Sequence, residues 1–275
     1  MTVLVTGATG NVGRHLVREL LDDGRRVRAL SRDPARAGLP AEVEVVGGDL
    51  AEPDTLGGVF DGVVAVHLIT FDGSGPLTNG RELVELAVKA GVRRATTLWS
   101  GEVGDVERAV AAGGLEWTRL EPVEYMSNAL AWAESVRAEG LVREPFPEEP
   151  SAMVHEGDIA RVAAAALVGD GHTGRSYSLT GPEVLTVPDK VRILAAALGR
   201  DLRYVELSES AARERMRAAG TPEDVVDFVI GWHRNPPEQA YSLSSTIEEV
   251  TGLPPRSFAD WAREHASAFS VPPSS

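Results

Sequence analysis

The chain has 275 residues, 43% of them hydrophobic, which is enough for one large α/β domain or for a domain with an appended lobe. Its formal net charge of −14 repels phosphate backbones and anionic lipids, so we expect neither a nucleic acid nor a membrane as a partner. The absence of cysteine excludes disulfides, thiolate catalysis and cysteine-ligated zinc.

Short apolar segments alternate with helix-like segments through the first 122 residues. The spacing predicts strands at residues 3–5, 26–30, 43–46, 63–69, 95–98 and 117–120, and helices at residues 11–23, 81–89 and 106–112. Strands that are apolar throughout and alternate with helices are typical of a parallel sheet covered on both faces. The predicted fold class is therefore α/β, with a doubly wound parallel sheet of the Rossmann type.

The pattern changes after Pro122. A helix is expected at residues 125–139, then an irregular proline-rich connection, an alanine-rich helix at 158–168 and a strand at 176–179. The chain from Gly181 onward is predicted to be mostly helical. We therefore expect a Rossmann domain at residues 1–150, and the last sheet elements with a small, mostly helical C-terminal lobe at residues 151–275.

The most informative segment is GATGNVG, a GxxGxxG pattern between the first strand and the first helix. Gly7 permits the tight turn, Gly10 lets the backbone approach a pyrophosphate, and Gly13 allows close packing of helix on strand. The N–H groups at the start of the helix attract phosphate. The alternative, a glycine-rich turn without a ligand, fits this context less well. The expected pyrophosphate contacts are Gly7, Thr9, Gly10, Asn11, Val12 and Gly13.

The end of the second strand favours NADP(H) over NAD(H). An acidic residue there usually bonds the ribose 2′-hydroxyl of NAD, whereas an arginine accommodates a 2′-phosphate. This strand ends with Ser31 and Arg32, which suit a phosphate. The alternative is that Arg32 is an ordinary surface arginine. Asp49 and Leu50 are expected near the adenine, although Asp49 also fits a turn aspartate.

The carboxyl ends of the other strands should face the ligand crevice of such a sheet. The residues expected beside the nicotinamide and its ribose are Leu68, Ile69, Thr70, Ser100 and Pro122. Tyr125 and Ser100 are the candidates for catalysis, with a strand-end cap as the alternative for Ser100. The candidate substrate contacts are His67, Phe71, Trp99, Tyr125, Met126, Asn128, His155 and Trp232. For His67 and the aromatic residues, the alternative is packing in the core.

Other chemistries lack their motifs. The sequence contains no HExxH pattern and its histidines are scattered, so no metal is expected. It contains no GxSxG elbow, so serine hydrolase chemistry is not supported. Glu148 and Glu149 are interpreted as solvated surface carboxylates, and His233 as a residue that caps a pocket or packs the lobe.

The sequence resembles the NmrA-like atypical short-chain dehydrogenases over nearly its whole length. The similar N-terminal segments are VLVTGATGNVGRHLV, VRALSRDPARA, VKAGVRRATTLWS and GLEWTRLEPVEYMSNAL. The similar C-terminal segments are HEGDIARVAAAAL and GRSYSLTGPEVLTVPDKVRILAAALGR. The resemblance implies a Rossmann domain, a small C-terminal lobe that binds the substrate, and a preference for NADP(H). Members of this family are either NAD(P)H-dependent reductases or regulators that sense the dinucleotide without turnover.

The sequence departs from ordinary short-chain dehydrogenases in its catalytic residues. Those enzymes use a Tyr with a Lys four residues later. The two lysines here, Lys89 and Lys190, follow Glu85 and Thr186 at that spacing, so the Tyr–Lys pair is absent. The paired serines of the family are replaced by Trp99–Ser100, and its arginine before the proline turn by Glu121.

These features predict an NADPH-dependent reductase that transfers hydride to a small organic acceptor, such as a quinone, an enone or a biosynthetic intermediate. The alternative is a non-catalytic, NADP(H)-sensing regulatory protein of the NmrA type. The N-terminus lacks the basic region of a signal peptide, and no apolar run approaches the roughly 20 residues that span a bilayer. We therefore expect a cytoplasmic protein, a monomer or a homodimer, with a small molecule as its partner.

Overall fold

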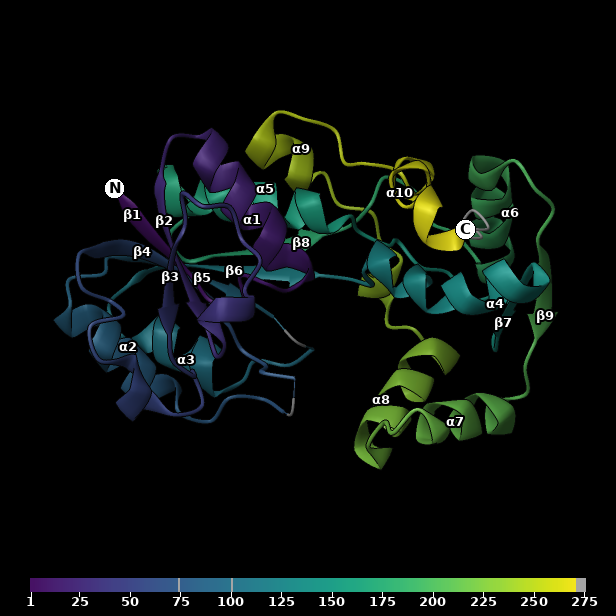
Figure 1. Cartoon of the computed structure of the whole chain (residues 1–275), viewed down its shortest axis with the longest axis horizontal. Coiled ribbons are helices and arrows are strands. Elements are labelled where there is room, and N and C mark those ends of the chain that lie inside the picture. Colours follow the sequence, from purple (N-terminus) through teal and green to yellow (C-terminus); the bar gives the residue numbers. More distant parts are fainter. Residues whose placement is uncertain (74, 100, 271–275) are drawn as a thin grey trace. The chain divides into compact units, whose positions relative to one another are not determined.

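The structure is a computed structural model that describes residues 1–73, 75–99 and 101–270. The chain forms two compact units. The first unit consists of Met1–Pro122, Glu156–Leu179 and Thr246–Leu253, and the second consists of residues 123–155, 180–245 and 254–270. Figure 1 gives the position of each element along the chain.

The first unit is built on a parallel sheet of seven strands in the order β3-β2-β1-β4-β5-β6-β8. The strands are β1 (Thr2–Val5), β2 (Arg26–Ser31), β3 (Glu44–Gly47), β4 (Val63–Ile69), β5 (Arg94–Leu98), β6 (Glu116–Pro122) and β8 (Arg175–Leu179). The order reverses between β1 and β4, which is the topological switch point of a doubly wound sheet. The predicted fold class is confirmed.

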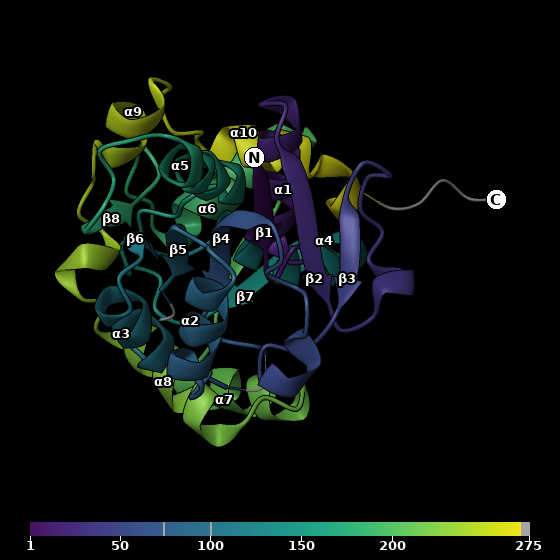
Figure 2. The same cartoon turned by 90° about the vertical axis from the view of Figure 1, so that its left-hand side faces the viewer.

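Helices cover both faces of this sheet (Figures 1 and 2), with α1, α5 and α9 on one side and α2 and α3 on the other. Their bounds are α1 (Asn11–Asp22), α2 (Gly80–Lys89), α3 (Asp105–Ala112), α5 (Glu156–Val168) and α9 (Thr246–Thr251), with short 3-10 turns at η1 (Pro34–Arg36) and η2 (Pro53–Leu56). Helix α1 buries Val12, Leu16, Val17 and Leu20 on one stripe, as its apolar spacing predicts. It ends before Gly24, whose φ of +69° is the left-handed conformation that glycine adopts after a helix.

The second unit is mostly helical, as predicted, with one small parallel sheet. Its helical elements are η3 (Met126–Trp132), α4 (Ala133–Glu139), α6 (Val187–Leu198), α7 (Glu209–Ala218), α8 (Glu223–Arg234), η4 (Glu238–Ala240), α10 (Phe258–Glu264) and η5 (Ala266–Phe269). Its strands β7 (Leu141–Glu144) and β9 (Arg203–Glu206) pair in parallel. Phe258 and Trp261 stack at 5.4 Å between ring centroids in its core, and both are fully buried.

Two sequence predictions differ from the structure of this unit. The helix expected at residues 125–139 begins as the 3-10 segment η3, because Met126, Ala129 and Trp132 bury at a spacing of three, which matches three residues per turn. Strands β7 and β9 were not predicted, since each has only four residues and β9 reads RYVE, without an apolar run.

The compact units also differ from a single division at residue 150. Strand β8 pairs with β6 in the large sheet, so the segment Glu156–Leu179 returns to the first unit. Residues 123–155 lie in the second unit instead. A chain that leaves a sheet and re-enters it cannot be divided by one boundary. Within the described residues, no helix combines the length and apolarity needed to cross a membrane.

Candidate dinucleotide site

The glycine loop is held against the end of β4 by Thr6. The Thr6 hydroxyl donates to the backbone oxygen of His67 at 2.8 Å and accepts from the backbone N–H of Ile69 at 2.9 Å. Gly7 follows with a φ of +60°, and a Cβ at this position would come within 2.6 Å of the Ile69 Cγ2 atom. A side chain at residue 7 is therefore excluded both by conformation and by space.

The start of α1 has the electrostatics of an anion site. Its N-cap is Gly10, which has no side chain to cap the first turn, and that turn contains no acidic residue. The Gly10 N–H donates to the Gly7 oxygen at 2.9 Å, which closes the loop. The N–H groups at the start of a helix attract anions through the helix dipole. A pyrophosphate fits this helix end.

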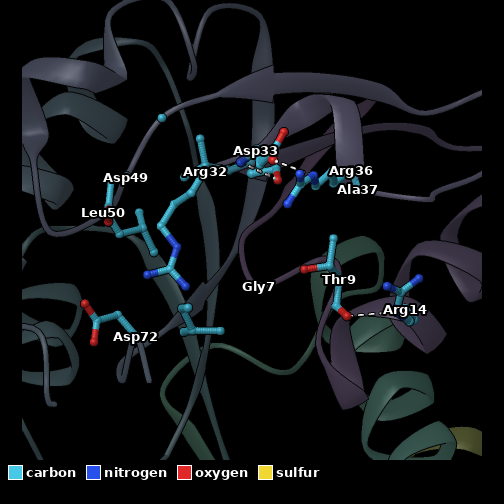
Figure 3. Close-up of a pocket in the computed structure, with 14 residues that line it drawn as sticks. Gly7, Thr9, Arg14, Arg32, Asp33, Arg36, Ala37, Asp49, Leu50 and Asp72 are labelled. Carbon is cyan, nitrogen blue, oxygen red and sulfur yellow. Dashed lines mark hydrogen bonds and ion pairs between the residues drawn. The ribbon is translucent and has the colours of Figure 1, made fainter. Parts of the chain in front are cut away.

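A pocket of about 400 Å³ extends from this loop over the carboxyl ends of β2, β3 and β4 (Figure 3). It brings together seven of the predicted cofactor residues: Gly7, Thr9, Ser31, Arg32, Asp49, Leu50 and Ile69. Arg14, Asp33, Arg36 and Asp72 also line it and were not predicted. The size and the mixture of polar and apolar groups suit the adenosine half of a dinucleotide.

Three arginines line this pocket, which fits a ligand that carries several phosphates. Arg14 is fixed by its Nε, which donates to the Thr9 oxygen at 2.8 Å. Arg36 lies 3.5 Å from the Asp33 carboxylate, measured from its Nε. Among the described residues, no carboxylate forms an ion pair with Arg32, whose guanidinium points into the pocket in Figure 3. A phosphate at the end of β2 would supply that counter-charge.

Asp49 and Leu50 lie in a turn whose polar groups already form hydrogen bonds within the protein. The Asp49 carboxylate accepts from the backbone N–H of Ala51 at 2.9 Å, and its own N–H donates to the Thr55 hydroxyl at 2.9 Å. The side chain of Leu50 is buried, and its oxygen accepts from the Asn79 amide at 2.6 Å. The turn-aspartate alternative therefore describes the local role of Asp49.

The remaining predicted residues of the first unit have structural contacts of their own. Thr70 is buried and its hydroxyl donates to the Leu98 oxygen at 2.8 Å. Leu68 and Pro122 are buried, whereas Phe71 is 41% exposed. On α1, Val12 packs into the core, Gly13 contacts the loop, and Asn11 is exposed. The Trp99 N–H donates to the Leu120 oxygen at 2.9 Å, and Ser100 lies outside the described residues.

His67 lies inside the sheet, as its structural alternative predicted. Its side chain is 1% exposed and its Nδ1 lies 2.8 Å from the Thr96 hydroxyl. Burial lowers the pKa of His67 to about 4, so the ring is neutral at physiological pH. It does not line the pocket at the glycine loop.

The second unit holds the other predicted substrate residues, and the structure does not gather them at one point. Met126 is buried in its core, while Tyr125 is half-buried at the start of η3. Asn128 lines a separate cavity of this unit. The ring of Trp232 lies 6.0 Å from that of Phe228, between centroids. The Nε2 of His155, which is buried, lies 3.1 Å from Glu264.

The parallel sheet, the glycine loop and the arginine-lined pocket together define a dinucleotide-binding protein of the Rossmann class. Within the described residues, no group of three or more potential metal ligands occurs.

Comparisons with known proteins agree with this class. A family model described as NAD(P)H-binding matches residues 7–142. A (4-alkanoyl-5-oxo-2,5-dihydrofuran-3-yl)methyl phosphate reductase of Streptomyces griseus is 38% identical, over 98% of this chain and 99% of the relative. An NAD(P)H azoreductase of Xenophilus azovorans is 33% identical, over 98% and 99%. The NADPH complex of a quinone oxidoreductase from Escherichia coli superposes with a TM-score of 0.80 at 23% identity, over 95% and 99%.

The chain belongs to the NAD(P)H-binding family. This confirms the resemblance recognised in the sequence and the prediction of an NAD(P)H-dependent oxidoreductase. The structural neighbour, at 23% identity, supports the fold alone.

Proposed function

We propose that this protein transfers hydride from NADPH to a small, electron-poor organic acceptor such as a quinone, an enone or a biosynthetic intermediate. The observation that carries the proposal is the pocket at the glycine loop. Arg32, which directly follows β2, lines this pocket, and no carboxylate among the described residues forms an ion pair with it. In this proposal the pyrophosphate lies on the start of α1, and Ser31 and Arg32 bind the 2′-phosphate.

The preference for NADPH follows from the charges at the end of β2. A carboxylate that bonded the ribose hydroxyls would repel a 2′-phosphate. The acid closest in sequence is Asp33, which faces the Arg36 guanidinium and whose N–H donates to the Ser31 hydroxyl at 3.2 Å. Three aspartates, Asp33, Asp49 and Asp72, line the pocket beside its three arginines, so the charge that suits a 2′-phosphate is that of Arg32, which no carboxylate pairs among the described residues.

The nature of the acceptor is inferred from chemistry that needs no Tyr–Lys pair. The bound nicotinamide would supply the hydride, and the protein would supply orientation and exclusion of water. The two relatives of 38% and 33% identity are named for a dihydrofuranone phosphate and for azo reduction, and such conjugated groups accept hydride readily. We propose the same substrate class here, with the second unit as the part that binds it, and with Tyr125 and Ser100 as candidates for contact with the reacting group.

A second candidate function is a dinucleotide-sensing regulator without turnover. It is favoured by the lysines of this chain: Lys190 is buried in an ion pair with Glu124, and Lys89 lies at the end of α2. Neither follows a tyrosine by four residues.

Steady-state oxidation of NADPH distinguishes the two functions. The purified protein is assayed with naphthoquinone, cyclohexenone and an azo dye, with NADH in parallel. The reductase predicts turnover with at least one acceptor and a higher kcat/KM for NADPH than for NADH. Tight binding of NADPH in calorimetry, together with no oxidation above the protein-free rate, would favour the regulator instead.

A further inference from the structure

The second unit contains a cavity of about 520 Å³ formed by residues of η3, α6, α7 and α8. Its apolar wall includes Ala129, Trp132, Val187, Met216, Val229 and Ile230. A concave apolar surface with a few polar groups is the usual form of a small-molecule site. Its lining also includes Ser127, Asn128 and three ion pairs, two of which are more buried than the third, Arg215–Glu144.

The first pair joins Lys190 and Glu124. The Lys190 side chain is 5% exposed, and its Nζ lies 3.0 Å from Oε2 of Glu124. The Ser151 hydroxyl donates to the same oxygen at 2.6 Å. Burial raises the pKa of Glu124, but the charges of Lys190 and His233 and the hydrogen bond from Ser151 outweigh it, so this pKa falls below its usual value. The pair is therefore ionised and internally neutralised.

The second pair joins His233 and Glu149. The Nδ1 of His233 lies 2.5 Å from Oε1 of Glu149, whose side chain is 7% exposed. The interpretation of Glu149 as a solvated surface carboxylate is therefore wrong: helix α8 brings His233 onto it from 84 residues away. The imidazole is 29% exposed, and within the described part of the chain its Nε2 has no hydrogen-bond partner.

The surroundings of this pair keep a proton on it. Burial lowers the pKa of His233, but the hydrogen bond that its Nδ1–H donates to Glu149 and the charges of Glu124 and Glu149 outweigh burial and the repulsion from Lys190, so this pKa is raised. Burial also raises the pKa of Glu149, against the opposing effect of His233. The other charged residues of the cavity, Arg215 and Glu144, pair with each other at 2.6 Å.

The charges of the cavity indicate what it would bind. With His233 protonated, Glu124, Glu149, Lys190 and His233 sum to zero. An anionic ligand therefore gains no net attraction, while an uncharged one can enter without leaving a buried charge unpaired. Asn128 lines the same cavity, and the Nε2–H of the His233 imidazolium is a donor that suits a carbonyl oxygen.

We propose that this cavity holds an uncharged, conjugated carbonyl compound, the acceptor of the proposed reductase, and that His233 donates the proton that its reduction requires. Glu149 acts as the positioning residue, because it fixes the ring through Nδ1 and leaves Nε2–H for the substrate. This inference rests on the proposed function and assigns the acid that the missing Tyr–Lys pair would otherwise supply.

In the proposed reduction, bound NADPH would supply a hydride to the β-carbon of an enone, the C=C π electrons would move toward the carbonyl, and the oxygen would take the Nε2 proton of His233. The acceptor would gain two electrons and two hydrogens, NADP⁺ would remain, and water would reprotonate the neutral imidazole. A quinone follows the same balance and leaves as the hydroquinone.

The kinetic test compares His233→Gln with His172→Gln, a matched change in the first unit. With cyclohexenone and naphthoquinone as acceptors, we expect His233→Gln to lower kcat about 100-fold for the enone, with an unchanged Kd for NADPH. The wild-type kcat should fall as pH rises through the pKa of His233, and His233→Gln should lose that fall. Glu149→Gln should shift it to lower pH. An unaltered kcat and pH profile in His233→Gln, with an active wild type, would overturn the role of His233.

A binding test separates this inference from the proposed function. Naphthoquinone bound in the cavity should quench the fluorescence of Trp132, so saturable quenching should be present in the wild type and lost in Trp132→Phe. If the wild type oxidises no NADPH but shows this quenching, the reductase fails and the ligand site stands. If no saturable quenching depends on Trp132, the site is refuted even in an active reductase.

Discussion

Gly13 packs against the backbone of Gly7 so closely that a Cβ atom on Gly13 would lie only 2.1 Å from the Gly7 oxygen. The loop after β1 and the first turn of α1 are therefore in direct backbone contact. This contact leaves no room for a side chain between the loop and the helix, and it places the first turn of α1 beside the glycine loop that lines the pocket.

We expect Gly13→Ala to be costly for both stability and cofactor binding. The added methyl must displace either the loop or the helix, so the free energy of unfolding should fall by about 1–3 kcal/mol. The displaced loop should also weaken NADPH binding. Urea unfolding without cofactor measures the first effect, and calorimetry with NADPH the second.

The matched control is Gly231→Ala, in the interior of α8. A Cβ on Gly231 would meet no atom within 4 Å, and alanine is the better helix former, so stability should be unchanged or rise by up to about 1 kcal/mol. A Gly13→Ala protein as stable as this control would show that loop and helix can separate without cost.

The 2′-phosphate assignment predicts a selective effect of Arg32→Ala. Loss of a charge-assisted hydrogen bond costs about 1.5–3 kcal/mol, so the Kd for NADPH should rise roughly 10- to 100-fold while the Kd for NADH stays within about twofold. Arg26→Ala is the control, since Arg26 is exposed at the opposite end of the same strand. Equal losses for both coenzymes would remove the assignment.

The centre of the large sheet was readable from the sequence because β1 and β4 are apolar on both faces, apart from Thr2 and His67. Residues 63–69 were predicted with the bounds that β4 has, and the other strands of this sheet differ by at most two residues at either end. Buried parallel strands have no polar face, so their limits coincide with the limits of the apolar run.

The residues that line the pocket at the glycine loop were predicted where a motif implies geometry and missed where it does not. Ser31 and Arg32 follow from their position at the end of a strand. Arg14 was missed although it follows Gly10 by four residues, which on a helix brings it back over the same end. Arg36 lies in the 3-10 turn η1, whose direction the sequence does not reveal.

The second unit was predicted least well because its structure depends on distant pairings. Strands β7 and β9 are joined from Leu141 to Arg203, and neither is recognisable alone. The same limit hid the pair of Glu149 and His233. A buried ion pair between residues 84 apart leaves no local pattern to detect.

Arg28 should contribute to stability through the backbone it binds, rather than through its ion pair. Its Nη1 donates to the backbone oxygens of Val59 and Asp61 at 2.9 and 2.8 Å, which ties β2 to the chain before β4. Arg28→Ala should lower the free energy of unfolding by about 2–3 kcal/mol, because these hydrogen bonds to a charged donor are lost.

A substitution of Glu44 tests whether the ion pair of Arg28 contributes little to stability. Glu44 lies 3.0 Å from the Arg28 Nε but is 55% exposed, and this contact lacks hydrogen-bond geometry. Glu44→Gln should therefore change stability by no more than about 0.5–1 kcal/mol. A larger loss in Glu44→Gln than in Arg28→Ala, measured by urea unfolding, would reverse the assignment.

His67 should make the protein less stable in mild acid. The pKa of His67 is about 4 in the folded protein, whereas the ordinary value of 6.5 applies to the unfolded chain. Between these pH values the unfolded chain therefore binds a proton that the folded protein does not bind. Stability from this group is complete above pH 6.5 and falls by about 1.4 kcal/mol for each pH unit below it, or roughly 2–3 kcal/mol by pH 4.5. His67→Gln can keep a hydrogen bond to Thr96 and does not titrate.

The wild type should therefore be the more stable of the two proteins at pH 7.5. Its advantage in unfolding free energy should shrink as the pH falls, because the other titratable groups contribute equally to both proteins and cancel in the difference. A difference in unfolding free energy that stays constant from pH 7.5 to 4.5 would show that His67 is protonated in the folded protein as easily as in the unfolded one.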